Sequence, residues 1–412
     1  MNLAVISVGA LALAVLVSCF SRLNVGVLAL ALAWLVGVYV GGQPVNTVMG
    51  GFPSQLFLTL AGVTLLFAIA QANGTLERIT HHAVRLCRGN RGVIPVMFFA
   101  LGAALSSMGP GNIATAALVA PLAMATAVRS GIPLFLMAIM VGNGSNAGAL
   151  SPFAPTGIIV NGLMARNGLP GLEAQTYLYN LAAHMLMAFG GYAIFGGLRL
   201  FRRGSVAAVA GLDRASTSFE AHHWLTMAVI ATLILSVLFA NIHVGMGAFA
   251  GAVVLVLGRA GSDAEAIRQM PWKVIVMVCG VTVLIALVER AQGIDLLVSL
   301  VARVSTADSV TFVVAALTGI VSVYSSTSGV VLPAFLPMVP GLADALPGAS
   351  AVAIASSMNI GGHLVDVSPL STIGALCLAG APADESRSLF NKLLAWGLSM
   401  SIVGGALCYL IF

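Results

Sequence analysis

The chain has 412 residues, of which 59% are hydrophobic and 8% are charged, and its mean hydropathy is +1.04. Soluble domains carry about 25% charged residues, so this composition excludes a soluble globular domain and indicates an all-α protein that crosses the membrane several times. The net charge of +5 predicts no nucleic-acid partner, because membrane topology accounts for the positions of the basic residues.

Apolar runs near the length of a membrane-spanning helix recur through the first half of the chain, residues 1–201. In chain order they predict three scaffold spans within 3–72, a re-entrant hairpin, a span broken in its middle and a last span: 3–20, 24–41, 55–72, 94–128, 133–165 and 176–201. A polar linker at 202–222 follows, and the second half, 223–412, repeats the order: 223–241, 244–259, 273–290, the hairpin 309–340, the broken span 350–380 and 388–411. About ten spans and two hairpins are therefore expected.

The hairpins are predicted from two apolar stretches that a short polar sequence interrupts. The interruptions read LSSMGPGN, from Leu105 to Asn112, and YSSTSG, from Tyr324 to Gly329. Each half has about 15 residues, which is short for a full span of about 20 residues. Irregular backbone at membrane depth is tolerated only where it is buried in protein or lines a cavity. Both tips are therefore expected at a polar site.

The distribution of Lys and Arg predicts the orientation of the chain. With these crossings, fifteen of the eighteen basic residues fall on one side, and only Arg166, Arg290 and Arg303 fall on the other. Because cytoplasmic loops collect Lys and Arg, the richer side, with the linker 202–222, is expected in the cytoplasm. Both termini then face outward, as in a multi-pass protein of a bacterial-type inner membrane. The first hairpin enters from inside and the second from outside.

The two halves resemble each other in sequence at a nearly constant offset. Gly144 corresponds to Gly361, Asn146 to His363, and Gly157 to Gly374. Each half has five crossings, one of them broken, and an odd number places the two repeats in opposite orientations. Inverted repeats with discontinuous helices at matching positions are the best sequence indication of a secondary transporter and of its binding site.

The broken helices predict what is bound. Half-helix N-termini carry free N–H donors and partial positive charge, which suit carboxylates, whereas unwound carbonyls suit cations. Two tips and two breaks predict two anion cradles, which match a short substrate with a carboxylate at each end. No Arg or Lys lies in either hairpin or break, so hydroxyl groups, amides and backbone N–H groups are expected to bind this substrate.

Two sets of candidate residues follow. The substrate-binding candidates are Gly111, Asn112, Asn146, Ser326, Thr327, Ser328 and His363. The cation-coupling candidates are Ser106, Ser107, Asn143, Gly144, Ser325, Asn359, Gly361 and Asp366. Of the thirteen acidic residues, Asp366 alone is expected deep in the membrane, where a carboxylate needs a proton, a partner or a cation. Capping of the half-helices is the alternative role for these polar residues.

With these motifs, the chain resembles the ion-transporter superfamily that includes the divalent-anion/sodium symporters, and is most similar to its malonate and dicarboxylate (MatC-type) carriers. The most specific stretches are GNIATAALVAPL, from Gly111 to Leu122, and Asn-Ile-Gly-Gly, from Asn359 to Gly362. The resemblance implies import of a small dicarboxylate coupled to a cation gradient, an elevator motion against a scaffold, and a homodimer. The tips depart from the Ser-Asn-Thr triplets of the symporters, which leaves Na⁺ and H⁺ both open as the coupling ion.

The same features argue against other classes of membrane protein. The alternative within the superfamily is an exchanger or efflux carrier of another anion or of an inorganic ion. An intramembrane aspartyl protease needs two intramembrane aspartates, and a serine-type protease explains neither the repeats nor the hairpins, so an enzyme is not expected. A channel rarely needs two oppositely oriented hairpins. The five scattered cysteines predict neither disulfides nor a zinc site, and no cofactor is expected beyond the coupling ion.

Overall fold

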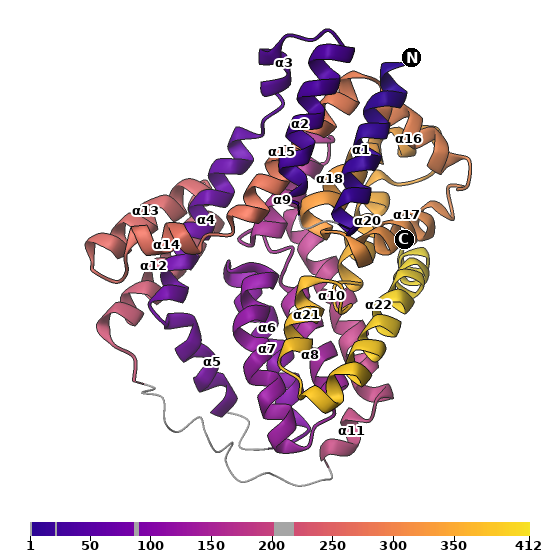
Figure 1. The fold of residues 1–412 in the computed structure, drawn as a ribbon. Coiled ribbons are helices and arrows are strands. Elements are labelled where there is room, and N and C mark those ends of the chain that lie inside the picture. Colours follow the sequence, from indigo (N-terminus) through magenta and orange to yellow (C-terminus); the bar gives the residue numbers. More distant parts are fainter. Residues whose placement is uncertain (1, 21–22, 86–89, 202–217) are drawn as a thin grey trace.

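In the computed structural model, residues 2–20, 23–85, 90–201 and 218–412 are described, and their regular elements are all helices (Figure 1). The first half contains α1 (Leu3–Phe20), α2 (Val25–Trp34) with the π-helical η1 (Leu35–Val40), α3 (Val45–Met49), α4 (Ser54–Ala72), α5 (Thr75–Arg85), α6 (Val93–Met108), α7 (Gly111–Ser130), α8 (Leu134–Ala147), α9 (Pro155–Arg166), α10 (Glu173–Ile194) and α11 (Gly197–Leu200). Of the predicted linker 202–222, residues 202–217 lie outside the described residues.

The second half contains the same kinds of element in the same order. They are α12 (Ala221–Ala240), α13 (Val244–Leu257), α14 (Asp263–Gln269), α15 (Trp272–Arg290), α16 (Gly293–Ala302), α17 (Val310–Tyr324), the π-helical η4 (Thr327–Val331), α18 (Leu332–Phe335), η5 (Leu336–Met338), α19 (Val339–Ala345), α20 (Ala351–Leu364), α21 (Thr372–Ala379) and α22 (Ala383–Ile411). The short helices α3 and α14, and likewise α5 and α16, occupy corresponding places in the two halves.

The described helices have the composition of a membrane protein. Six helical segments are long and apolar enough to cross a membrane: α4, α7, α12, α15, Thr327–Ala345 and α22. Further apolar helices of 10–17 residues include α6, α8, α13 and α17. Large apolar side chains such as Phe239, Leu257 and Leu410 are exposed on the outer helices, as lipid contact requires. The prediction of an all-α, multi-pass membrane protein is confirmed.

The first hairpin turns later than the sequence suggested. Helix α6 continues to Met108, so Ser106 and Ser107 lie in its last turns and not in the connecting turn. The chain reverses at Gly109 and Gly111, whose φ angles are +142° and +78°, and only glycine adopts such angles without strain. Because these two glycines make a short reversal possible, the polar serines remain helical, and the second arm α7 reaches 20 residues.

Two pairs of scaffold helices cross through glycines at corresponding positions of the two halves. A Cβ atom on Gly26 of α2 would lie 2.5 Å from the Cα atom of Met277 in α15. A Cβ atom on Gly245 of α13 would lie 2.5 Å from the Cα atom of Thr59 in α4. Small residues allow helix backbones to approach this closely. Each crossing therefore joins one helix of the first half, α2 or α4, to one helix of the second half, α15 or α13. The two crossings use corresponding helices and corresponding glycines.

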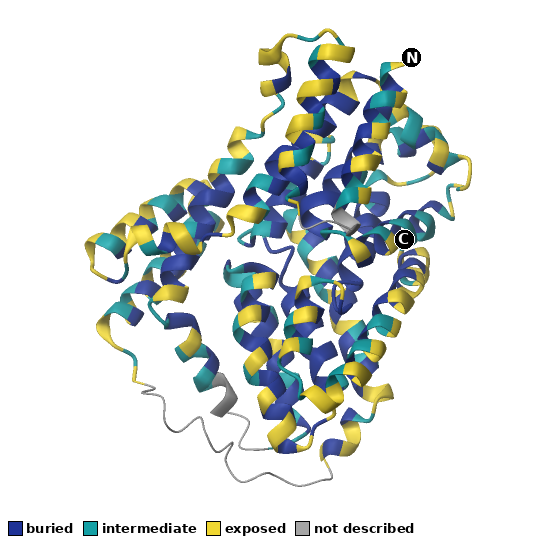
Figure 2. Ribbon diagram, in the orientation of Figure 1, coloured by how far each residue is buried: buried dark blue, intermediate teal, exposed yellow. Residues whose placement is uncertain are grey.

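The hairpins and broken spans pack together in a second group of helices. A Cβ atom on Gly144 of α8 would lie 2.7 Å from the Cα atom of Phe99 in α6, and one on Gly361 of α20 would lie 2.6 Å from that of Ala315 in α17. Helices α8 and α20 are buried over nearly their whole length, whereas α12, α13 and α22 expose one face (Figure 2). Most residues of the breaks at 148–154 and 365–371 are buried as well, with Leu370 exposed, which agrees with the expectation that irregular backbone is enclosed by protein or lines a cavity.

Candidate functional site

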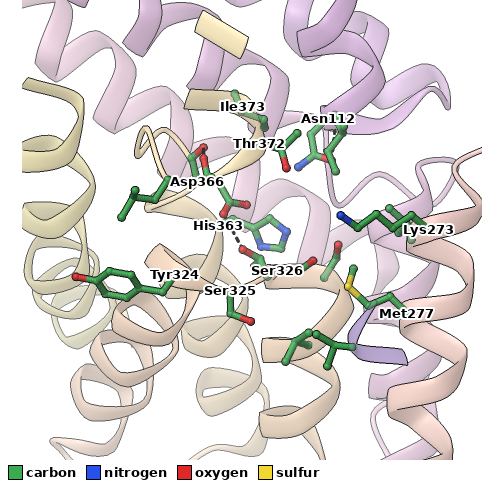
Figure 3. A pocket seen from close by; sticks show the side chains of 18 of the residues that line it. Asn112, Lys273, Met277, Tyr324, Ser325, Ser326, His363, Asp366, Thr372 and Ile373 are labelled. Carbon is green, nitrogen blue, oxygen red and sulfur yellow. Dashed lines mark hydrogen bonds between the residues drawn. The ribbon is translucent and has the colours of Figure 1, made fainter. Parts of the chain in front are cut away.

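A cavity of about 470 Å³ lies between this second group of helices and the scaffold, and we call it the central cavity (Figure 3). Its lining includes seven of the predicted site residues: Asn112, Ser325, Ser326, Thr327, Ser328, His363 and Asp366. These residues come from the first hairpin, the tip of the second hairpin and the second broken span. The scaffold contributes Asn24, Lys273 and Met277 to the opposite wall.

Three helix N-termini meet at the central cavity. Asn112 is at the start of α7, Thr327 is the first residue of η4, and Thr372 is the first residue of α21. The η4 segment is capped by Ser326 Oγ, which accepts from the N–H of Gly329 at 3.2 Å. Helix N-termini present free N–H groups and partial positive charge. This wall of the cavity is therefore suited to anionic groups.

The carboxylate of Asp366 is held by the tip of the second hairpin. Thr327 Oγ1 donates a hydrogen bond of 2.7 Å to Asp366 Oδ1. The hydroxyls of Ser322 and Thr327 are also in contact, and Ser371 Oγ donates to the backbone carbonyl of Asp366. Only 8% of the Asp366 surface is exposed. An acidic residue that deep in a membrane protein marks an ion or substrate pathway by default.

His363 is fully buried and has one ring nitrogen without a protein partner. Its Nδ1 atom lies 2.8 Å from the backbone carbonyl of Asn359, and a carbonyl only accepts, so Nδ1 carries a proton. Its Nε2 atom has no hydrogen-bond partner among the described residues. Figure 3 shows the ring between Asp366, Ser326 and Lys273. Nε2 itself is enclosed by protein, so His363 lines the central cavity without exposing this nitrogen to it.

Asn112 and Asn146, predicted to serve one site, form a direct hydrogen bond. Asn112 Nδ2 donates to Asn146 Oδ1 at 2.9 Å, and Asn180 Nδ2 donates to the backbone carbonyl of Asn146 at 2.8 Å. This network ties the first hairpin to α8 and α10. Of the two, Asn112 lines the central cavity, while Asn146 is fully buried behind it. Asn146 therefore contacts Asn112 and does not itself line the central cavity.

Gly111 lines a neighbouring cavity of about 250 Å³. The two cavities share Asn112, Ile113, Val274 and Ser328. The tip of the first hairpin therefore has the central cavity on one side and this smaller cavity on the other.

Several predicted residues lie outside the central cavity. Ser107 Oγ contacts the Ala103 carbonyl at 2.6 Å and the hydroxyl of Tyr177 at 2.9 Å. Asn143 Nδ2 donates to the carbonyl of Ile139 at 2.8 Å. These bonds give both residues a place within the packing of α6, α8 and α10. Ser106 is fully buried, and its hydroxyl has no hydrogen-bond partner among the described residues.

The remaining candidates belong to the contacts between helices. Gly144 and Gly361 are the close-approach positions of α8 and α20. Asn359 Nδ2 lies 3.6 Å from the sulfur of Met164, and its Oδ1 atom has no partner among the described residues. No three or more His, Cys, Asp or Glu side chains gather into a metal-binding group in the described ranges. Hydroxyl and carbonyl oxygens surround Asp366 in the central cavity, and oxygen ligands are those that hard cations prefer.

The structure adds one charged residue that the sequence argument did not assign to the site. Lys273 lies near the start of α15, outside both hairpins and both breaks, and it lines the central cavity. In the sequence it counted only as one of the cytoplasmic basic residues. Comparison of the two halves could have singled out Lys273, because the corresponding residue of the first half is the neutral Gln55.

Comparison with known proteins identifies two similar families and one similar fold. Residues 1–149 match the family described as dicarboxylate carrier protein MatC N-terminus, and residues 237–412 match the family described as citrate transporter. The fold is similar to the crystal structure of the YdaH transporter of Alcanivorax borkumensis, with a TM-score of 0.64 and 18% identity over 88% of this chain and 87% of that one. No curated protein sequence matches at a significant level.

The two family matches divide the chain between a dicarboxylate carrier description and a citrate transporter description. Both descriptions are of transport proteins and not of enzymes. The chain is thus an all-helical, multi-pass membrane protein that is similar to a dicarboxylate carrier family in its first part and to a citrate transporter family in its second part.

Proposed function

We propose that the protein is a secondary active transporter that imports small dicarboxylates, malonate or a C4 diacid, and that a gradient of Na⁺ or H⁺ drives it. The observation that carries this proposal is the buried carboxylate of Asp366, held by Thr327 in a cavity onto which three helix N-termini open. The same wall of the cavity thus offers a cation site and an anion site side by side. Adjacent sites of opposite charge are what coupled transport of an anion requires.

The substrate would lie between the two hairpin tips. One carboxylate meets the N-terminus of α7 at Asn112, and the other meets Ser326 and the N-termini of η4 and α21. His363 lines the same cavity between these two positions. The citrate-transporter match of the second part makes a tricarboxylate the natural competitor to test beside the diacids.

Coupling is assigned to Asp366, because a bound cation or proton neutralises its charge next to the substrate. Asp366→Asn keeps the size and the hydrogen bond from Thr327 but removes the charge and the titration. In proteoliposomes this variant should still exchange labelled substrate across the membrane, while accumulation driven by an ion gradient and its dependence on pH should be lost. Gradient-driven accumulation equal to that of the parent between about pH 5.5 and pH 8 would assign Asp366 a capping role.

The transport movement is proposed to be an elevator motion. The matching Gly26 and Gly245 crossings support two inverted repeats that build one scaffold, and the matching Gly144 and Gly361 contacts support one mobile group of hairpins and broken spans. A scaffold that stays still while this group moves needs support in the membrane, and we propose that two copies provide it as a homodimer. The predicted orientation, with both termini outside an inner membrane, belongs to this proposal.

A further inference from the structure

Lys273 introduces a positive charge into the central cavity from the scaffold side. Among the described residues, Lys273 and Asp366 are the charged side chains that line this cavity. Figure 3 shows the Lys273 side chain extending into the cavity toward His363. Charged side chains in membrane proteins face water-filled cavities and mark substrate pathways. The alternative is a lysine that anchors α15 at the membrane interface.

The backbone of Lys273 is fixed to the scaffold. Its carbonyl accepts a hydrogen bond of 3.0 Å from Asn24 Nδ2, in the segment that leads into α2. Four residues further along α15, on the same face of the helix, Met277 packs on the tip of the second hairpin. A Cβ atom on Gly329 would lie 2.9 Å from the Met277 sulfur. Lys273 therefore lies one turn from the place where the scaffold contacts this hairpin.

The ammonium group of Lys273 has no hydrogen bond or ion pair within the described part of the chain. The carboxylate of Asp366 is bonded to Thr327, so the two charges of the cavity do not neutralise each other by direct contact. The coupling ion balances Asp366 in the proposed function. One unit of positive charge then remains for a substrate carboxylate, in addition to the partial charges of the helix N-termini.

The corresponding position in the first half is neutral. Gln55 occupies the place of Lys273 in the repeat, and it lines another cavity of about 800 Å³ together with Gly51, Thr59 and His243. Thr59 and His243 correspond to Met277 and Asn24, which line the central cavity. The two cavities are therefore counterparts in the repeat, and the lysine stands in only one of them. The charged residues that line the cavity of Gln55 are two basic and two acidic ones, Arg166, Arg290, Glu173 and Glu289, whose formal charges balance, whereas Lys273 is the basic residue among those described in the central cavity.

We propose that Lys273 binds a carboxylate of the substrate from the scaffold while the central cavity is open, and that this contact is lost when the hairpins and broken spans move away. This inference rests on the proposed function. The contact with Lys273 makes substrate binding stronger, and more selective for the doubly charged diacid, at the membrane face to which the central cavity opens. At the opposite membrane face, where Gln55 lines the corresponding cavity, this contact is missing. The residue sets specificity at one face of the membrane.

The test uses the full-length protein in oriented membrane vesicles, with malonate and its half-amide as probes applied from each side. Lys273→Gln, which copies the residue of the other half, should weaken malonate binding at the face of the central cavity by about tenfold or more. It should change binding at the other face by less than about threefold and abolish the preference for malonate over its half-amide. Lys273→Arg should stay within about threefold of the parent, because it keeps the charge.

The matched control is Arg268→Gln, since Arg268 is an exposed basic residue on the neighbouring α14, paired with Glu265 at 2.8 Å and not part of the cavity lining. It should leave both probes unchanged. Lys273→Cys, labelled with an aminoethyl reagent that restores the ammonium group, should regain the preference and so excludes misfolding as the cause. Unchanged affinity and preference in Lys273→Gln, with an active parent, overturn this inference alone. Absence of carboxylate transport by the parent overturns the proposed function itself.

Discussion

Replacing Thr327 by Val removes the hydroxyl that holds Asp366 while keeping the shape of the side chain. The bond of 2.7 Å from Thr327 Oγ1 to the carboxylate joins the hairpin tip to the second broken span. A hydrogen bond to a charged group contributes about 1.5–3 kcal/mol, which corresponds to about tenfold to a hundredfold in an equilibrium constant. Because this hydrogen bond stabilises the ionised carboxylate, its loss should change the affinity of Asp366 for the coupling ion by that factor.

The assay is substrate uptake into proteoliposomes at a series of Na⁺ concentrations and pH values. Thr327→Val should shift the half-maximal cation concentration by about tenfold or more, and Thr327→Ser should restore it. Thr318→Val is the matched control: Thr318 is fully buried, and its hydroxyl bonds the Val314 carbonyl of its own helix at 2.8 Å. This control should stay within about threefold of the parent. A Thr327→Val protein with the cation dependence of the parent would refute the assignment of the coupling site.

Two further predictions concern the scaffold and the movement. Gly280→Ala places a Cβ atom 2.6 Å from the Cα atom of Gly26 and should destabilise the protein by about 1–3 kcal/mol, measured as thermal unfolding in detergent. Gly9→Ala is the control, because no atom lies within 4 Å of the added Cβ atom, and it should leave stability unchanged. Equal unfolding temperatures of the two variants would contradict the close crossing of α2 and α15. Cysteines at Met277 and Gly329, in a protein without native cysteines, should be crosslinked with a yield that depends on substrate, and crosslinking should stop transport. Continued exchange after complete crosslinking would argue against an elevator motion.

The architecture was predictable because hydropathy and segment length dominate in a bilayer. The span predicted at 55–72 is α4, Ser54–Ala72, and the interruption predicted within 350–380 separates α20 from α21. The meeting of Asn112 with Asn146 also follows the sequence argument, because both are polar groups at membrane depth that need partners. The roles of these residues stay predictions.

The parts that were not predictable depend on contacts between distant segments. Ser107 bonds Tyr177 in α10, and no local pattern around the serine indicates that partner. The position of the first tip depends on the positive φ angles of Gly109 and Gly111. The sequence instead suggested that the chain turns at the polar serines Ser106 and Ser107, which lie just before these glycines. The sequence predicted Lys273 to be a basic residue of a cytoplasmic loop. Its place in the lining of the central cavity depends on how α15 packs on Asn24 and on the second hairpin, which the sequence around it does not indicate.

In the proposed function, this protein accumulates small dicarboxylates at the expense of a cation gradient. The direct measurement is uptake of labelled malonate, succinate and citrate into proteoliposomes, with an imposed Na⁺ gradient, an imposed pH gradient or none. The account predicts saturable accumulation of a diacid above its equilibrium level under one of the two gradients, and collapse of that accumulation when an ionophore dissipates the gradient. Uptake of none of the three acids, or a large conductance that does not saturate, would contradict it.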